Sequence, residues 1–168
     1  VAKAPDLVRI VVGVDPPGGA TECGIVAVGK GKDGHAYIIR DDSLQASPDL
    51  WARAVLSCAS KTEANSVVGE KNFGGDMVGD TLHTAAQVLG QSLFYKDVSA
   101  SRGKAVRAEP VAALFEQGRA HIVGSLPRLE DELCLWLPSS TGNSPNRLDA
   151  MVWAAVELML GAEAKIWV

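Results

Sequence analysis

The sequence contains little cysteine, few aromatic residues and no long hydrophobic run. No apolar stretch approaches the roughly 18 residues that a helix needs to cross a bilayer. The first six residues also lack the charged leader and apolar segment that begin a secretory signal. We therefore expect a soluble cytosolic protein with no membrane association.

The three cysteines, Cys23, Cys58 and Cys134, are widely spaced. Their number is odd and no Cys-x-x-Cys pair occurs, so neither a disulfide framework nor a zinc knuckle is indicated. Free cysteine is among the most frequently buried residue types in proteins. We expect three buried thiols.

Several catalytic motifs are also missing. The phosphate-binding motif G-x-x-x-x-G-K-[ST] does not occur, and the tripeptide GKA at 103–105 lacks its spacing and its hydroxyl. The G-x-S-x-G turn of serine hydrolases is absent as well. His35, His83 and His121 are isolated in the sequence, without the spacing of a zinc site. Nothing therefore indicates an ATPase, a serine hydrolase or a zinc protein.

The composition is that of one globular domain. The chain has 168 residues, of which 47% are hydrophobic and 21% charged, so residues 1–168 are long enough to enclose a core. The net charge of -4 gives no sign of a basic surface for a polyanion. A chain of this charge that binds nucleic acid either holds cations in a carboxylate cluster or depends on another domain to grip the polyanion, and both explanations remain open.

Three runs near the N-terminus predict strands. Residues 8–15 (VRIVVGVD) form a nearly continuous apolar run that ends at Pro-Pro-Gly-Gly, which is typical of a strand buried on both faces. Residues 23–30 and 35–43 are strand-like and are separated by the turn sequence Gly-Lys-Asp-Gly. These runs predict an antiparallel meander.

After residue 47 the pattern alternates between helices and strands. The predicted helices are an amphipathic segment after Ser47-Pro48-Asp49, then 76–89, 110–117, 127–137 and a last one with an apolar stripe from Leu148 to Met159. The predicted strands are 66–69, 93–98 and 120–123. The strand at 66–69 is expected to run parallel to the first strand. The order predicts an α/β fold with a mixed central sheet flanked by helices.

Three carboxylates stand at the ends of predicted elements. Asp15 ends the first strand, Glu70 follows the fourth, and Asp149 lies in the first turn of the last helix. The ends of neighbouring parallel strands lie about 4.8 Å apart, which brings Asp15 and Glu70 together. A carboxylate cluster is unfavourable without cations, and its hard oxygen ligands suit Mg²⁺ or Mn²⁺. Acids in these positions are common as caps and turn formers, so both interpretations stay open on the pattern alone.

Longer strings carry a resemblance to a known family. The first strand, VVGVDPPGG, is similar to the opening acidic motif of the C-terminal nuclease domain of phage large terminase subunits. Four further strings resemble the same domain in the expected order: VVGEKNFGGDMV (67–78), ASRGKAVRAEPVAALFEQGRAHIVG (100–124), LEDELCLW (129–136) and SPNRLDAMVWAAVELM (144–159). The resemblance covers about residues 8–160.

The resemblance implies an RNase H-like fold and an endonuclease that cuts concatemeric double-stranded DNA during capsid packaging. Its metal carboxylates fall here on Asp15, on Glu70 and on Asp149, and they imply two Mg²⁺ or Mn²⁺ ions. It further implies a packaging ATPase domain, which this sequence does not contain. The implied partner proteins are a portal and a small terminase subunit. The implied location is the host cell cytoplasm.

Other residues are candidates for contacts with DNA. Arg102 and Lys104, in the string Ser-Arg-Gly-Lys, are expected to meet phosphates, although a basic loop is often only solvated. Lys71 either approaches the scissile phosphate or screens the acids beside it. Asp76 fits the N-cap of a helix better than it fits a fourth metal carboxylate.

In the mechanism we expect, Asp15 bridges two ions, Asp149 completes one metal site and Glu70 the other. Two alternatives remain. One is a resolvase or integrase of the same fold, which prefers branched DNA or transfers strands. The other is a DNA-docking module without catalytic activity.

Overall fold

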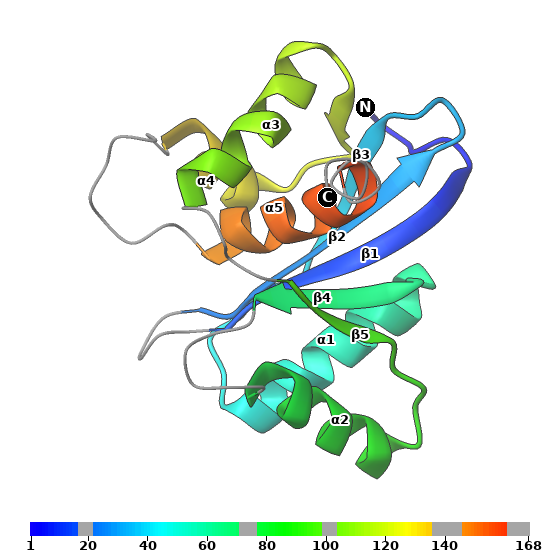
Figure 1. The fold of residues 1–168 in the computed structure, drawn as a ribbon, viewed down its shortest axis with the longest axis vertical. Coiled ribbons are helices and arrows are strands. Elements are labelled where there is room, and N and C mark those ends of the chain that lie inside the picture. Colours follow the sequence, from blue (N-terminus) through cyan, green and yellow to red (C-terminus); the bar gives the residue numbers. More distant parts are fainter. Residues whose placement is uncertain (17–21, 71–76, 99–103, 136–145, 161–168) are drawn as a thin grey trace, which may run out of the picture.

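The computed structural model describes residues 1–16, 22–70, 77–98, 104–135 and 146–160, without the side chains of 104–107. In this part of the chain a six-stranded sheet carries helices on both faces (Figure 1). The strands are β1 (Leu7–Asp15), β2 (Gly24–Gly31), β3 (Ala36–Asp41), β4 (Ser66–Glu70), β5 (Tyr95–Val98) and β6 (Ala120–Ile122). The helices are α1 (Pro48–Thr62), α2 (Met77–Leu89), α3 (Lys104–Glu116), α4 (Pro127–Leu135) and α5 (Asn146–Met159).

The strand order is β5-β4-β1-β2-β3-β6. The pairs β1–β2 and β2–β3 are antiparallel, as the predicted meander requires. The pairs β1–β4, β4–β5 and β3–β6 are parallel. The predicted parallel return of the fourth strand beside the first is therefore confirmed, and β1 lies in the middle of the sheet.

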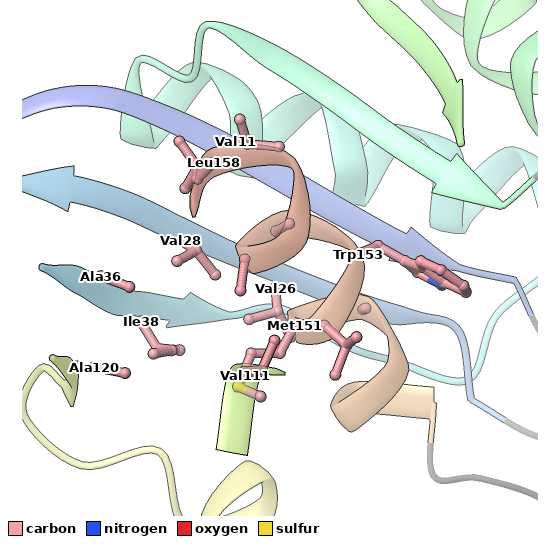
Figure 2. Close-up of a cluster of buried hydrophobic side chains, with 14 of the residues drawn as sticks. Val11, Val26, Val28, Ala36, Ile38, Val111, Ala120, Met151, Trp153 and Leu158 are labelled. Carbon is pink, nitrogen blue, oxygen red and sulfur yellow. The ribbon is translucent and has the colours of Figure 1, made fainter. Parts of the chain in front are cut away.

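Two apolar cores separate the sheet from its helices. One core lies under α5, which packs between the sheet and the pair α3 and α4 (Figure 1). Val11, Val26 and Val28 of the sheet and Met151, Trp153 and Leu158 of α5 belong to this core (Figure 2). The second core, on the opposite face, joins the sheet to α1 and α2. The fold therefore has three layers.

The nearly continuous apolar run of β1 follows from this position. Successive side chains of a strand point to opposite faces of the sheet. Val11 accordingly packs in the core under α5, whereas Val12 and Val14 pack in the core under α1 and α2. Both faces of β1 are covered, so both sets of side chains are apolar.

One predicted helix begins in a different place. The sequence predicts a helix that begins at Pro110, but α3 begins at Lys104 and contains Pro110. Ala108, Val111 and Leu114 share one buried side that faces the core under α5. Burial of this side extends the helix to the N-terminal side of the proline, where local pattern favours a loop.

The cysteine prediction is correct for two of the three thiols. Cys23 and Cys58 are buried, whereas Cys134 near the end of α4 is exposed. Leu133, beside it, packs against the core, so Cys134 points to another side of the same short helix. Among the described residues, no helix combines the length and the hydrophobicity required to span a bilayer.

Candidate active site

Two glycines let α5 lie directly on the sheet. A Cβ atom placed on Gly13 of β1 would lie 1.9 Å from the carbonyl oxygen of Ala150. A Cβ atom placed on Gly24 of β2 would lie 2.0 Å from the carbonyl oxygen of Asn146. No side chain fits at either position, so the first turns of α5 rest on the backbone of β1 and β2.

Asp15 is at this contact. It is the last residue of β1 and pairs with Gly24 across the antiparallel ladder. It lies two residues after Gly13, so its side chain is on the same face of the sheet as α5. The residue is only 6% exposed. Together with burial, which is the larger cause, its charge raises the pKa of the nearby Cys23 thiol.

Asp149 comes to the same place from α5. It is also 6% exposed, and it precedes Ala150, whose carbonyl oxygen faces Gly13. Residues four apart lie on the same side of a helix, so Asp149 shares a side with Trp153 and Glu157. Glu157 contacts Lys96 of β5 at 3.0 Å and Arg9 of β1 at 3.7 Å. Asp149 therefore lies on the side of α5 that faces β1, β4 and β5.

Glu70 ends the neighbouring parallel strand. Gly13 pairs with Val68 and Val14 with Gly69, so the next step of the register sets Glu70 beside Asp15. Val68 packs in the core under α5, and Glu70, two residues later, is on the same face. Its side chain is partly exposed, unlike those of the two aspartates. The three acids thus lie at one end of the sheet, where β1 and β4 end and α5 begins (Figure 1).

The burial of Asp15 and Asp149 favours a metal site over a role as helix cap or turn former. Within the described ranges, the buried polar or charged residues are Asp15, Arg147 and Asp149. Acids that serve only as caps or turn formers gain their stabilisation at the surface, where the ionised form stays hydrated. Two carboxylates buried on one face require compensating hydrogen bonds or a cation.

The residues fit a hard divalent cation in their chemistry. Carboxylate oxygens are the ligands that Mg²⁺ and Mn²⁺ prefer. In the part of the chain that the structure describes, no group of three or more His, Cys, Asp or Glu side chains is arranged as a formed metal site. The observation in favour of a site is therefore the burial of Asp15 and Asp149 on one face, with Glu70 next in register.

A group of charged residues that sequence reasoning missed lies beside Asp149. Arg147 is 5% exposed, and its Nε donates a hydrogen bond to Asp41 Oδ2 at 3.0 Å. Its Nη1 contacts Glu132 Oε1 at 3.5 Å and donates a short hydrogen bond to Glu22. Burial opposes the charged form, but the carboxylates prevail and raise the pKa of Arg147. The only signal in the sequence was the position of Arg147 within the string NRLDA.

Two of the histidines, which are far apart in the sequence, lie next to each other in the fold. His35 Nδ1 lies 2.9 Å from His121 Nε2, because β3 and β6 are parallel neighbours. The two ring centroids are 5.2 Å apart and the ring planes differ by 21°. The N···N distance is that of a hydrogen bond. The pair lies at the β6 edge, away from Asp15.

The remaining candidates are the predicted DNA contacts and Asp76, and the structure describes little of them. Lys71, Arg102 and Asp76 lie outside the described residues. Lys104 is the first residue of α3, and its side chain lies outside the described part as well.

Comparison with solved structures identifies relatives of the fold. The large terminase nuclease of thermophilic phage G20c with bound zinc matches at a TM-score of 0.67 and 14% identity, over 89% of this chain and 81% of that one. The large terminase of thermophilic bacteriophage D6E in complex with ADP matches at 0.70 and 12%, over 96% of this chain but 42% of that one. The yeast mitochondrial Holliday junction resolvase Ydc2 matches at 0.60 and 13%, over 98% and 83%.

These neighbours confirm the predicted RNase H-like fold with a mixed sheet. A search of the curated proteins found no match. The model of one protein family, described as the terminase RNaseH-like domain, matches residues 12–158, a span that begins within β1 and ends within α5. The predicted resemblance to the terminase nuclease domain is thereby confirmed, and the chain belongs to the terminase RNaseH-like domain family.

Proposed function

We propose that this chain is the nuclease domain of a viral DNA-packaging terminase and hydrolyses phosphodiester bonds of concatemeric double-stranded DNA with the help of divalent cations. The observation that carries the proposal is the burial of Asp15 and Asp149 on one face of the sheet, where α5 rests on Gly13 and Gly24. Family membership supports the reaction class.

Asp15, Glu70 and Asp149 are the proposed cation ligands. Asp15 ends the central strand, with Glu70 next to it in register and Asp149 above it in α5. We propose that Asp15 is shared by two Mg²⁺ or Mn²⁺ ions, with Asp149 completing one site and Glu70 the other. When bound, such ions supply Lewis acidity to the phosphate and lower the pKa of water.

The surroundings of the acids suit this task. Asp15 and Asp149 are almost shielded from solvent, which strengthens their attraction for cations because the local dielectric is low. Both stand on regular elements whose packing fixes their direction, and this precision favours catalysis. Structures of the G20c terminase nuclease with bound zinc and with bound magnesium support the use of divalent ions.

The wider assembly is part of the proposal. The D6E large terminase was solved with ADP, and this chain spans 42% of its length. We propose that an ATPase domain, a portal and a small terminase subunit act together with this domain in the host cell cytoplasm. The net charge of -4 fits a domain that depends on such partners to hold DNA.

Cleavage of supercoiled plasmid tests the proposal. We expect nicking that requires Mg²⁺ or Mn²⁺ and is abolished or nearly abolished by Asp15→Asn, Glu70→Gln and Asp149→Asn. Each change keeps the size of the side chain and removes a charge that holds cations. Asp49→Asn, on the exposed first turn of α1, is the matched control and is expected to cut at the wild-type rate. Wild-type cutting by the Asp15 and Asp149 variants would contradict the proposal.

A resolvase-like activity is the second candidate. It is favoured by the match to the yeast resolvase over 98% of this chain. Parallel assays on a linear duplex and on a four-way junction of the same sequence distinguish the two. Preferential, symmetrical cutting of the junction would favour the second candidate, and equal or better cutting of the linear duplex favours the terminase.

A further inference from the structure

We infer that Arg147 is a positioning residue, which fixes the first turn of α5 and thereby the direction in which Asp149 faces Asp15. The inference rests on the proposed function, because it assigns the role of Arg147 through the proposed cation site. Arg147 lies two residues before Asp149 and points to another side of α5.

Arg147 is held by carboxylates from three separate segments. Glu22 precedes β2, Asp41 ends β3 and Glu132 belongs to α4. The guanidinium contacts all three: Nε reaches Asp41, and Nη1 reaches both Glu22 and Glu132. Its planar, five-donor geometry makes several directed bonds at once, which the single ammonium of lysine does not reproduce.

The two residues on either side of Arg147 are tied to the same partners. The side-chain amide of Asn146 donates to the backbone carbonyl of Glu22. The backbone N–H of Leu148 donates to Glu132 Oε2 at 3.0 Å, which satisfies one of the free donors at the start of the helix. Each of the three residues before Asp149 is therefore anchored to Glu22 or Glu132.

Arg147 and Asp149 point in different directions. Residues two positions apart in an α-helix are separated by about 200° around its axis. Arg147 faces β3 and α4 through Asp41 and Glu132, whereas Asp149 shares the side of Glu157 that faces β1 and β5. Anchoring the Arg147 side thus fixes the rotation of the helix about its axis. Gly13 fixes the distance of the helix from the sheet.

The charge balance guides the choice of variants. One guanidinium faces three carboxylates, so its removal leaves like charges together in a partly buried place. Arg147→Met is expected to unfold the protein in part. A loss of activity in this variant would not show whether Asp149 had moved or the protein had unfolded. Arg147→Lys keeps the charge and loses the directed bonds, and Glu132→Ala removes the acceptor of Leu148.

The experiment compares these variants with a matched control. Arg128→Lys is this control, since Arg128 also contacts Glu22, at 3.6 Å, but its side chain is 74% exposed. Glu132→Gln is a third variant, because it keeps an oxygen acceptor for Leu148 but removes the carboxylate charge that faces Arg147. We measure plasmid nicking at saturating Mn²⁺, binding of Mn²⁺ by electron paramagnetic resonance, and amide hydrogen exchange at the start of α5.

For Arg147→Lys and Glu132→Ala we expect a fall of about tenfold in kcat and in Mn²⁺ affinity, the lower end for groups that orient metal ligands. The KM for DNA should stay unchanged, and the amide of Leu148 should exchange faster. Arg128→Lys should behave as the wild type, and Glu132→Gln should lose less than Glu132→Ala. A purely structural role would lower the melting temperature without separating kcat from KM.

Three outcomes would overturn the inference. The first is wild-type nicking and Mn²⁺ affinity in both variants. The second is an equal loss in Arg128→Lys, which would indicate a general effect of charge. The third is lost activity with unchanged exchange at Leu148. A wild-type protein that neither binds Mn²⁺ nor cuts would instead overturn the proposed function, and the inference with it.

Discussion

Gly13 of β1 and Ala150 of α5 are in direct backbone contact, because a Cβ atom on Gly13 would lie 1.9 Å from the Ala150 carbonyl oxygen. This contact joins the end of the central strand to the turn that carries Asp149. Asp15 is two residues beyond Gly13, and Asp149 is one residue before Ala150. The distance between the two carboxylates therefore depends on the absence of a side chain at Gly13.

Substitution of the two glycines tests this dependence. Gly13→Ala and Gly24→Ala are each expected to lower the free energy of unfolding by about 1–3 kcal/mol or more, because backbone atoms have to move. Displacement of α5 should also reduce plasmid nicking. Gly29→Ala is the control in β2, since the three atoms nearest its added methyl belong to the Leu7 side chain and not to backbone. Chemical denaturation measures stability, and equal losses in all three variants would contradict the prediction.

Binding of cations should stabilise the protein. Saturating Mn²⁺ or Mg²⁺ is expected to raise the melting temperature, because a ligand that binds only the folded state shifts the equilibrium. In chelator, Asp15→Asn and Asp149→Asn should melt at or above the wild-type temperature, since each removes repulsion between carboxylates. Differential scanning calorimetry with and without metal measures both effects. A wild-type transition that does not respond to either ion would count against the cation site.

Glu132 is expected to make stability depend on pH. Burial raises the pKa of its carboxyl above the usual 4.5, against the opposing effects of the Leu148 N–H and of Arg147. The folded protein thus holds this proton more tightly than the unfolded chain does. The resulting stabilisation is fully present below pH 4.5 and is lost as the pH rises through the raised pKa.

Glu132→Gln removes this titration and keeps an acceptor for Leu148. The variant should gain stability relative to the wild type as the pH rises from 4.5 toward neutrality. Denaturant unfolding of both proteins at a series of pH values gives the difference, which cancels the titration of other carboxylates. Parallel pH profiles for the two proteins would show that Glu132 contributes nothing to them.

Arg102 and Lys104 remain predicted DNA contacts. The double variant Arg102→Ala, Lys104→Ala is expected to bind duplex DNA more weakly at all sequences. Its plot of log affinity against log salt should be flatter by about 1.8, since each phosphate contact contributes about 0.9. Lys30→Ala, Lys32→Ala is the control with equal charge, near the turn after β2. An unchanged slope in the first variant would remove Arg102 and Lys104 from the DNA path.

The sequence alone determined the order of the strands and helices, and it singled out Asp15, Glu70 and Asp149 as candidate metal ligands. The apolar run before Asp15, the hairpin turn and the stripe in the last helix are local patterns, and the backbone responds to them over a few residues. The parallel direction of β4 relative to β1 also followed. Two antiparallel pairings set β3 parallel to β1, and a strand-helix-strand connection usually sets its second strand, here β4, parallel to its first, here β3. The longer strings supplied the family.

Tertiary structure alone decided which side chains share a place. Arg147 meets Glu22 and Asp41, which are 125 and 106 positions away in the sequence, and no local pattern predicts such contacts. His35 meets His121 only because β6 adds to the edge of β3. The burial of Asp15 and Asp149 likewise depends on how closely α5 approaches the sheet. That approach is set by packing between distant segments, whereas the sequence pattern reports only each segment's own preference.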